Sequence, residues 1–412
     1  MNLPKGIDVT DPALYDNGIP HELFAELRKN HPVWWNEQPS GVGGFEDEGY
    51  WVVSTHALVQ EVSRDSGQYS SWENTAIARY SDHVPRAAID ANRGILLNMD
   101  PPEHTALRKI ISRGFTPRAI AKLRDALSAR ANKIVADALA DGAGEFVADI
   151  AAELPLQAIT ELVGIPQDQR HQVFEWSNIM TGREDPDIIG DPVAAIGQVM
   201  QYSMGLAADR RGCPADDIAT ALVRAQDEDG ALTDLEFGYF VVLLMVAGSE
   251  TTRNAITHGM MAFQENPEQW ERFLRERPKT AIDEIIRWSS PVLSFQRTAT
   301  RDTELGGQSI RKGDRLLMLY ASANYDETVF ENPHTFDIGR DPNPHLGFGG
   351  TGAHYCIGAN LARMEIELIY DAIAEQMPEI SVIGPPRRLN SSFINSVKSL
   401  PVSYGTCPVQ SR

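Results

Sequence analysis

The sequence predicts a mainly α-helical protein with a small β region, folded as one domain, and two observations support this prediction. First, most apolar residues recur at the spacing of helices, whereas strand-like runs gather near residues 50–56 and 303–320. Second, the chain of 412 residues shows no internal repeat and no low-complexity linker. Because the strand-like runs come from distant parts of the chain, we expect residues 1–412 to form one interwoven domain.

The first half of the chain predicts one strand and two helices. The run YWVVS at residues 50–54 is rich in aromatic and β-branched side chains, as strands are. Residues 117–140 carry apolar side chains at helical spacing, and Pro117 suits the first turn, where a missing N–H breaks no helical bond. Residues 151–163 predict a further helix, which the following Gly-Ile-Pro sequence ends.

The clearest helix signal begins at Thr233. Thr233 and Glu236 have the spacing of a capping box, in which each side chain bonds a free backbone N–H at the helix start. No breaker follows before Asn266 and Pro267, so the helix has about 33 residues and is roughly 50 Å long. Its most apolar part, residues 237–248, spans about a dozen residues, whereas a membrane span needs about 20. We therefore expect a buried core helix and no membrane anchor.

The last third of the chain predicts three more helices and a hairpin. The helices fit residues 267–277, 279–288 and 358–377. Residues 304–310 (ELGGQSI) predict two short strands joined by a Gly-Gly turn, and the strand-like run RLLMLY follows at residues 315–320.

Composition and charge exclude several classes of protein. The chain is 42% apolar and 23% charged, as globular proteins are, and its net charge of −20 argues against a nucleic-acid partner. The three cysteines, Cys213, Cys356 and Cys407, are widely spaced and odd in number, which fits a reducing compartment rather than a disulfide framework. The N-terminal residues do not resemble a secretory signal, so we expect a cytoplasmic protein.

One basic segment stands out against this acidic background. Between residues 104 and 133 the sequence has eight Lys or Arg residues and one acid, Asp125. Taken alone, such a run indicates a solvated helix face.

The stretch FGGTGAHYCIG at residues 348–358 carries the most unusual local chemistry. Gly347, Gly349 and Gly352 fit the G-x-G-x-x-G pattern of dinucleotide-binding loops. That pattern requires a preceding apolar strand, and the residues before it here are polar and include two prolines. The context therefore argues against a dinucleotide site.

Cys356 lies just before a predicted helix. The positive end of a helix dipole and its free N–H groups favour a thiolate at this position. Gly349, Gly350 and Gly352 permit positive φ and let the backbone lie against a flat ligand, while Phe348 supplies an apolar lid. The alternative is a small buried cysteine in a loop, so the interpretation needs partners elsewhere.

The long helix supplies the first such partner in AGSETT, residues 247–252. Glu250 follows a wholly apolar stretch, where a carboxylate is costly unless it has a partner or a function. Gly248 removes a side chain, and the Thr251 hydroxyl can bond a carbonyl one turn back and bend the helix. Together these residues indicate an acid–alcohol pair that passes protons to a group beside the helix. The alternative is a kinked helix with a satisfied glutamate.

Further charged residues are unremarkable one by one. Glu284 and Arg287 in EIIR share one helix face, and Arg340 in FDIGR can join them in a buried network. Four other side chains can bind anionic carboxylates; they are His104, Arg108, Arg297 and His354.

Taken together, these motifs resemble the cytochrome P-450 family of haem-thiolate monooxygenases. HTALR, AGSETT, EIIR, FDIGR and FGGTGAHYCIG occur in the order of the family, and LNMDPPEH, ENP and ANLAR extend the likeness over nearly the whole chain. One departure concerns the cysteine loop: Phe348 precedes Cys356 by eight residues, whereas the commonest pattern of the family has seven.

The resemblance implies a single haem-binding domain of the cytochrome P-450 fold, with haem b (iron protoporphyrin IX) as cofactor. It implies that Cys356 is the axial iron ligand and that Glu250 and Thr251 deliver protons to dioxygen. It implies that His104, Arg108, Arg297 and His354 hold the haem propionates and that Phe348 and Gly358 belong to the cofactor loop. Glu284, Arg287 and Arg340 resemble the structural triad of the family.

The resemblance also points to a substrate and a partner. Several segments resemble actinobacterial members that hydroxylate a terminal methyl of the cholesterol or cholest-4-en-3-one side chain. We expect substrate contacts at Val246, Ala247, Val292 and Leu293, beside the haem. An acidic donor of the ferredoxin and ferredoxin reductase type is expected to dock near Arg108, Lys109 and Arg113.

Three alternatives remain from the sequence. Within the family, the substrate can instead be a branched fatty acid or an isoprenoid. A non-catalytic haem protein that only binds a ligand has no need of Glu250 and Thr251. A cysteine hydrolase using Cys356 and His354 lacks a group to orient the histidine.

Overall fold

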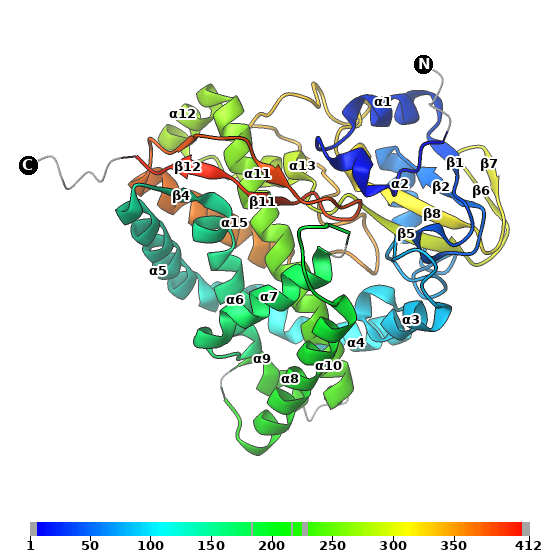
Figure 1. Ribbon diagram of the computed structural model, residues 1–412, viewed down its shortest axis with the longest axis horizontal. Coiled ribbons are helices and arrows are strands. Elements are labelled where there is room, and N and C mark those ends of the chain that lie inside the picture. Colours follow the sequence, from blue (N-terminus) through cyan, green and yellow to red (C-terminus); the bar gives the residue numbers. More distant parts are fainter. Residues whose placement is uncertain (1–5, 183, 216, 225–229, 406–412) are drawn as a thin grey trace, which may run out of the picture.

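The computed structural model describes residues 6–182, 184–215, 217–224 and 230–405. Helices form most of the molecule, and a five-stranded sheet lies at one side, next to the N-terminal helices (Figure 1). The expected mainly helical fold with a small β region is confirmed.

The α-helices are α1 (His21–Asn30), α2 (His56–Arg64), α3 (Arg86–Asp90), α4 (Glu103–Ile111), α5 (Pro117–Asp141), α6 (Glu153–Val163), α7 (Arg170–Thr181), α8 (Pro192–Gly212), α9 (Ile218–Val223), α10 (Asp234–Leu244), α11 (Thr251–Glu265), α12 (Pro267–Glu276), α13 (Thr280–Ser289), α14 (Tyr320–Ala323) and α15 (Ala359–Gln376). The strands are β1 (Val33–Glu37), β2 (Gly49–Val53), β3 (Tyr69–Ser70), β4 (Ala143–Glu145), β5 (Ser294–Ala299), β6 (Thr303–Leu305), β7 (Gln308–Ile310), β8 (Arg315–Leu319), β9 (Ser381–Val382), β10 (Arg387–Arg388), β11 (Val397–Ser399) and β12 (Pro401–Ser403).

The main sheet joins distant parts of the chain. Its strand order is β1-β2-β8-β5-β3, with β2 and β8 parallel, so that Trp51 pairs with Leu316 and Val53 with Met318. The predicted Gly-Gly hairpin is confirmed between β6 and β7, where Gly306 and Gly307 have φ of 54° and 78°. Glycine adopts positive φ without steric cost, so two successive glycines suit this turn.

Local capping explains where the predicted helices begin. The Thr116 hydroxyl accepts the Ala119 N–H at the start of α5, and Pro117 follows at the first helical position. At α10 the full capping box forms: the Thr233 hydroxyl accepts the Glu236 N–H at 3.2 Å, and the Glu236 carboxylate accepts the Thr233 N–H at 2.8 Å.

The long helix predicted from Thr233 to Asn266 is present, with one irregularity. Residues Met245–Glu250 form a π-helical turn between α10 and α11. The segment Asp234–Glu265 is long and apolar enough to cross a membrane, but 56% of its most apolar 18-residue stretch is buried inside the protein. It therefore has the character of a core helix, packed against α8, α6, α13 and α15.

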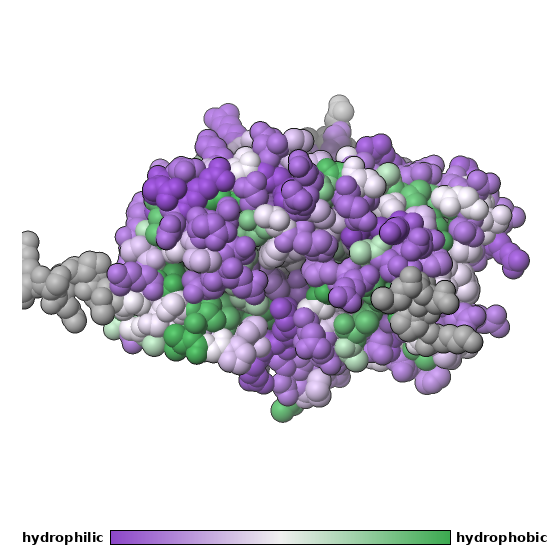
Figure 2. Space-filling model, turned by 90° about the horizontal axis from the view of Figure 1, so that it is seen from above, coloured by the Kyte–Doolittle hydropathy of each residue, from purple (hydrophilic) through white to green (hydrophobic). Residues whose placement is uncertain are grey.

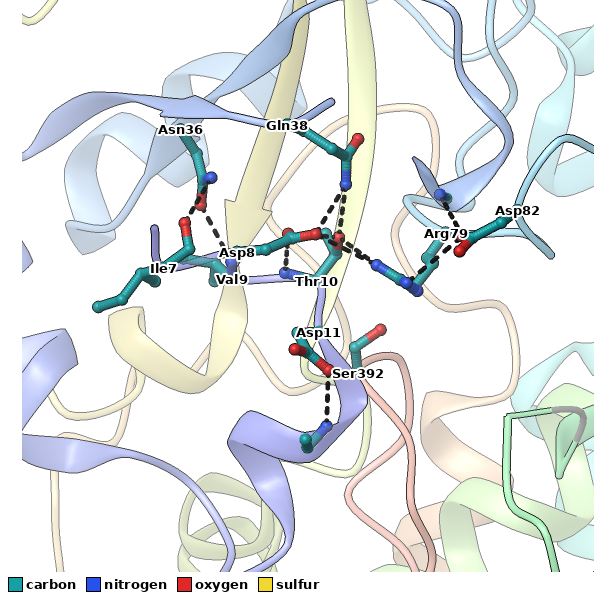
Figure 3. Close-up of polar contacts among 12 residues, drawn as sticks. Ile7, Asp8, Val9, Thr10, Asp11, Asn36, Gln38, Arg79, Asp82 and Ser392 are labelled. Atoms are coloured by element: carbon teal, nitrogen blue, oxygen red, sulfur yellow. Dashed lines mark hydrogen bonds and ion pairs between the residues drawn. The ribbon is translucent and has the colours of Figure 1, made fainter. Parts of the chain in front are cut away.

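The N-terminal segment is tied down by polar side chains (Figure 3). The Asp8 carboxylate accepts hydrogen bonds from Gln38 at 3.0 Å and from Arg79 at 3.2 Å, and Asn36 accepts the Val9 N–H at 3.0 Å. This network joins the start of the chain to β1 and to the loop that carries Arg79. Hydrophilic residues cover most of the face seen in Figure 2, as the net charge of −20 leads one to expect.

Candidate functional site

A large cavity lies between the cysteine loop and the long helix. Its walls come from α4, the π-helical turn and α11, from β5, from the loop of residues 347–358 and from α15. The space free of protein atoms there, counted together with the open solvent that adjoins it, is about 1480 Å³. Most of the lining is apolar, and Cys356 is part of it.

The π-helical turn shapes the wall opposite the cysteine. The Thr251 hydroxyl donates to the Ala247 carbonyl at 2.6 Å, which is the back-bond expected from the sequence. A side chain at Gly248 would collide with Ile159 of α6, so the glycine makes room for Ile159 rather than for empty space. Thr251, Ala247 and Gly248 all line the cavity.

The cysteine loop folds back on itself opposite this wall. The Cys356 N–H donates to the Phe348 carbonyl at 3.0 Å, and Gly349 and Gly352 have positive φ of 88° and 127°. Gly350 does not adopt the positive φ that a glycine permits. That glycine is needed because a side chain there would collide with Ser63.

Phe348 lies between the cavity and Arg363, whose guanidinium is 4.5 Å from the ring centroid. Helix α15 begins at Ala359, three residues after Cys356. Phe348 and Gly358 therefore both line the cavity from the loop that holds the cysteine.

The Cys356 side chain is exposed and lines the cavity. Burial raises its pKa, against the opposing effects of the Gly358 N–H, Arg108 and Arg363. The helix start alone therefore does not make the thiolate that the sequence led us to expect. A metal cation bound to the sulfur would reverse this direction, because a coordinating thiol is deprotonated.

The four predicted anion-binding side chains meet at one edge of the cavity. The rings of His104 and His354 are 4.2 Å apart, and Arg108 and Arg297 flank them. Arg297 is 3% exposed and donates a hydrogen bond to the Gln296 carbonyl at 2.7 Å. Within the described residues neither arginine forms an ion pair, and His104 Nδ1 has no hydrogen-bond partner.

Electrostatics at this edge favours an anionic ligand. Burial, followed by the nearby arginines, lowers the pKa of His104 to about 4, and burial and Arg297 lower that of His354 to about 2. Two partly or fully buried guanidiniums without carboxylates, beside a thiol that faces the same cavity, fit a flat iron-containing ligand with carboxylate groups. The residues present thus fit a haem.

Glu250 does not line the cavity. It is fully buried and forms an ion pair with Arg253, which also donates to Asn178 at 3.1 Å and to Ser396 at 3.1 Å. Burial raises the pKa of Glu250, and Arg253 opposes the rise. Its Oε1 has no hydrogen-bond partner within the described residues.

The predicted acid–arginine triad forms in full. Arg287 donates twice to the Glu284 carboxylate at 2.8 Å, and Arg340 donates to it at 3.0 Å. Glu284 and Arg287 are 0% exposed. Arg287 also donates to the carbonyls of Asn324 and Pro333 at 2.9 Å, so the triad fixes the segment before the cysteine loop.

The expected substrate contacts divide into two pairs. Ala247 and Val292 line the cavity, whereas Val246 and Leu293 lie outside its lining. Leu293 is 1% exposed and packs in the cluster formed by α1, β2 and β8.

Among the lining residues that sequence reasoning did not predict is a carboxylic acid, Glu365 of α15. It is a buried acid on an apolar helix face, nine residues after Cys356, and that placement is its sequence signal.

Comparison with known proteins agrees with this geometry. Residues 278–375 match the family model for cytochrome P450. A steroid C26-monooxygenase of Rhodococcus jostii is 58% identical over 99% of this chain and 88% of the relative. The chain belongs to the cytochrome P450 family.

More distant relatives agree with this assignment. A methyl-branched lipid omega-hydroxylase of Mycobacterium tuberculosis is 40% identical over 94% of this chain and 92% of the relative. The solved structure of a Mycobacterium marinum cytochrome P450 in complex with pseudoionone has a TM-score of 0.89 and 36% identity, and the match covers 98% of this chain and 99% of that one. As a cytochrome P450, this chain is a monooxygenase that uses haem b.

Proposed function

We propose that this cytochrome P450 hydroxylates the terminal methyl of a steroid side chain, with cholesterol or cholest-4-en-3-one as substrate, in the cytoplasm. The observation that carries the proposal is the apolar cavity that converges on Cys356 and Thr251. The 58% identical relative, which bears the name steroid C26-monooxygenase, supports the choice of substrate.

Cys356 would bind the haem iron through Sγ, and His104, Arg108, Arg297 and His354 would bind the propionates. Phe348 and Gly358 would contact the porphyrin from the cysteine loop. Haem with a thiolate ligand supplies the activation of O₂, since the thiolate pushes electron density toward the iron. The protein binds the substrate, orients it and controls the protons.

Hydroxylation consumes O₂, two electrons and two protons for each C–H bond converted to C–OH, and it releases one water. In the proposal Thr251 presents its hydroxyl to the cavity, with its proton held on the Ala247 carbonyl at 2.6 Å. Glu250 carries protons from outside to this hydroxyl. Because Glu250 is held by Arg253, it must leave that ion pair to do so.

A terminal methyl is harder to oxidise than the tertiary carbon beside it, so selectivity requires positioning. The cavity walls are bulky and apolar and favour a narrow alkyl chain end. This lining includes Ile111, Phe115, Ile159, Phe240, Leu243 and Leu244.

The electron donor would be an acidic ferredoxin supplied by its reductase. Arg108 and Lys109 lie on α4, which also lines the haem cavity, and Lys109 is exposed. Arg113 is half-buried, so Lys109 offers more charge to a partner than Arg113 does. Exposed cations of α5 extend this surface; they are Arg118, Lys122 and Arg124.

A spectral titration of the haem-loaded protein tests the substrate. Cholest-4-en-3-one, a methyl-branched fatty acid and an isoprenoid ketone are compared for the shift that follows loss of iron-bound water. Product is then identified after turnover with a ferredoxin system. Tight binding and terminal hydroxylation of the steroid support the proposal, whereas exclusive oxidation of the branched lipid would replace it with the activity that the 40% identical relative is named for.

A further inference from the structure

Asp283 of α13 contacts two residues that flank the cysteine loop. His345 precedes the loop and Arg363 follows it on α15, and both reach the same carboxylate oxygen of Asp283. The distances are 3.1 Å from His345 Nε2 and 2.7 Å from Arg363 Nε. Burial raises the pKa of Asp283, but the hydrogen bonds from His345 and Arg363 outweigh this effect and lower it. Asp283 is therefore an anion at neutral pH, and it ties both ends of the loop to α13.

The ring of His345 has a fixed tautomer. Its Nδ1 accepts the Gly347 N–H at 3.1 Å, so the ring proton is on Nε2, which donates to Asp283. The His345 side chain is 3% exposed. The Asp283 carboxylate thus meets one neutral donor and one cation, and the charge that it balances is that of Arg363.

Arg363 lies behind the ring of Phe348, which faces the cavity. Its guanidinium is 4.5 Å from the Phe348 ring centroid, a cation–π contact, whereas Arg363 itself is outside the cavity lining. The Phe348 carbonyl accepts the Cys356 N–H at 3.0 Å. The hydrogen bond to Asp283 therefore fixes a guanidinium against the residue that supports the cysteine.

The charge of Arg363 acts on the cysteine. Among the described residues, Arg108 and Arg363 are the cations that favour the anionic form of Cys356. Arg363 is paired with Asp283, whereas Arg108 has no carboxylate partner in the described part of the chain. A positive charge near the iron ligand favours the haem that has gained an electron, and a carboxylate beside that charge weakens the effect.

We propose that Asp283 is a positioning residue for electron uptake: it holds Arg363 against Phe348, balances its charge and so lowers the reduction potential of the haem. The step is the transfer of one electron from the ferredoxin-type donor, which is oxidised, to the ferric haem, which becomes ferrous. No bond or proton of Asp283 or Arg363 changes. The inference rests on the proposed binding of the haem iron by Cys356, and it is independent of the steroid substrate.

The test is a reductive titration of the haem-loaded protein without substrate, with dithionite and mediator dyes, which gives the midpoint potential. Asp283→Asn keeps an oxygen for Arg363 but removes the charge, and it should favour the ferrous form about threefold. At 59 mV per tenfold change for one electron, the potential rises by about 30 mV. The factor is modest because Asp283 and Arg363 are 36% and 34% exposed, so water and salt screen their charges. Arg363→Gln should shift the equilibrium by a similar factor in the opposite direction.

Three further variants separate the role of charge from that of structure. The double variant of Asp283→Asn and Arg363→Gln lacks both charges, so its potential should return close to that of the wild type. Asp283→Glu keeps the acid and should retain the wild-type potential. Glu367→Gln is the matched control, because it removes an acid of similar exposure, 34%, from a surface ion pair between α15 and Arg124. We expect no shift in this control.

Shifts in Asp283→Asn and Arg363→Gln that are no larger than in Glu367→Gln, or that have the same sign, would overturn the inference. A purely structural role would lower the urea midpoint of both variants without this opposite pair of shifts. The reduced, carbon-monoxide-bound sample separates the two proposals. Loss of the long-wavelength thiolate band in the wild type would refute Cys356 as the iron ligand, whereas a normal band with unchanged potentials would overturn the role of Asp283 alone.

Discussion

Replacing Glu284 by glutamine tests the buried triad most directly, because the change is nearly isosteric and removes one charge. The Glu284 carboxylate accepts two hydrogen bonds from Arg287 at 2.8 Å, one from Arg340 at 3.0 Å and one from Asn343 at 3.1 Å. It also accepts the Asp337 N–H at 3.0 Å. In the variant Arg287 is left with its full charge at 0% exposure.

Removing one partner of a buried ion pair costs about 3–5 kcal/mol, since the remaining charge stays desolvated. The glutamine carbonyl still accepts some of these hydrogen bonds, so we expect the lower end, about 3 kcal/mol. The rings of Trp288, Tyr325 and Phe330 lie within 5.8 Å of the Arg287 guanidinium, but cation–π contacts cannot replace a carboxylate.

The assay is urea unfolding of the haem-loaded protein, followed by loss of haem absorbance and by tryptophan fluorescence. Haem should be released at lower urea, because Arg287 and Arg340 fix the carbonyls of the segment that precedes the cysteine loop. Arg124→Gln is the control, since it breaks an exposed pair with Glu367 worth about 0–1 kcal/mol. A loss in Glu284→Gln no larger than that of the control would show that the triad is not the stabilising feature described here.

Four further predictions follow from the site. Cys356→His should keep part of the haem and lose oxygenase activity, because the thiolate push is gone; unchanged product formation would disprove the ligand assignment. Thr251→Ala should raise the peroxide formed per NADH, and Thr251→Ser should restore coupling. Coupling equal to wild type in the alanine variant would refute the proton-relay role of Thr251. Changing Lys109 and Arg113 to Glu should slow reduction by an acidic ferredoxin, more at low salt than at high salt. If the stopped-flow reduction rates depend neither on these substitutions nor on salt, this surface has no docking role. Burial lowers the pKa of His258 to about 4, below the ordinary 6.5. The unfolded state therefore binds more protons below pH 6.5, and stability falls from there toward pH 4, by about 3 kcal/mol from this group. His258→Gln should flatten that part of the stability profile, and a profile identical to the wild type would contradict the reasoning.

Local signals in the sequence were sufficient for several elements. The capping box at Thr233, the proline at the start of α5 and the Gly306–Gly307 turn each act over a few neighbouring residues, and each lies where it was predicted. Helices α7 and α8 and strands β1, β3 and β5 were not predicted. In α8 the apolar residues are spread around the helix, so no single apolar face marks it in the sequence.

The motifs and their order also predicted which residues gather around the cavity. The pair His104 and Arg108 is far along the chain from Arg297 and from His354, yet all four line one edge of the cavity that holds Cys356. Their chemical types were enough to suggest an anionic ligand. The sequence did not show which of the expected substrate contacts reach the cavity, because that depends on which side of the π-helical turn and of β5 each side chain occupies.

The sequence by itself determined the residue types of the site and the starts and turns that depend on near neighbours. The tertiary structure decided their charge states and partners. Gly248 leaves room for Ile159 of another helix, and Glu365 is buried without a counter-charge within the described residues. The pKa of Cys356 is likewise raised by burial against the effect of its helix start. Desolvation is set by everything packed around a group, and a linear pattern of residues does not contain that information.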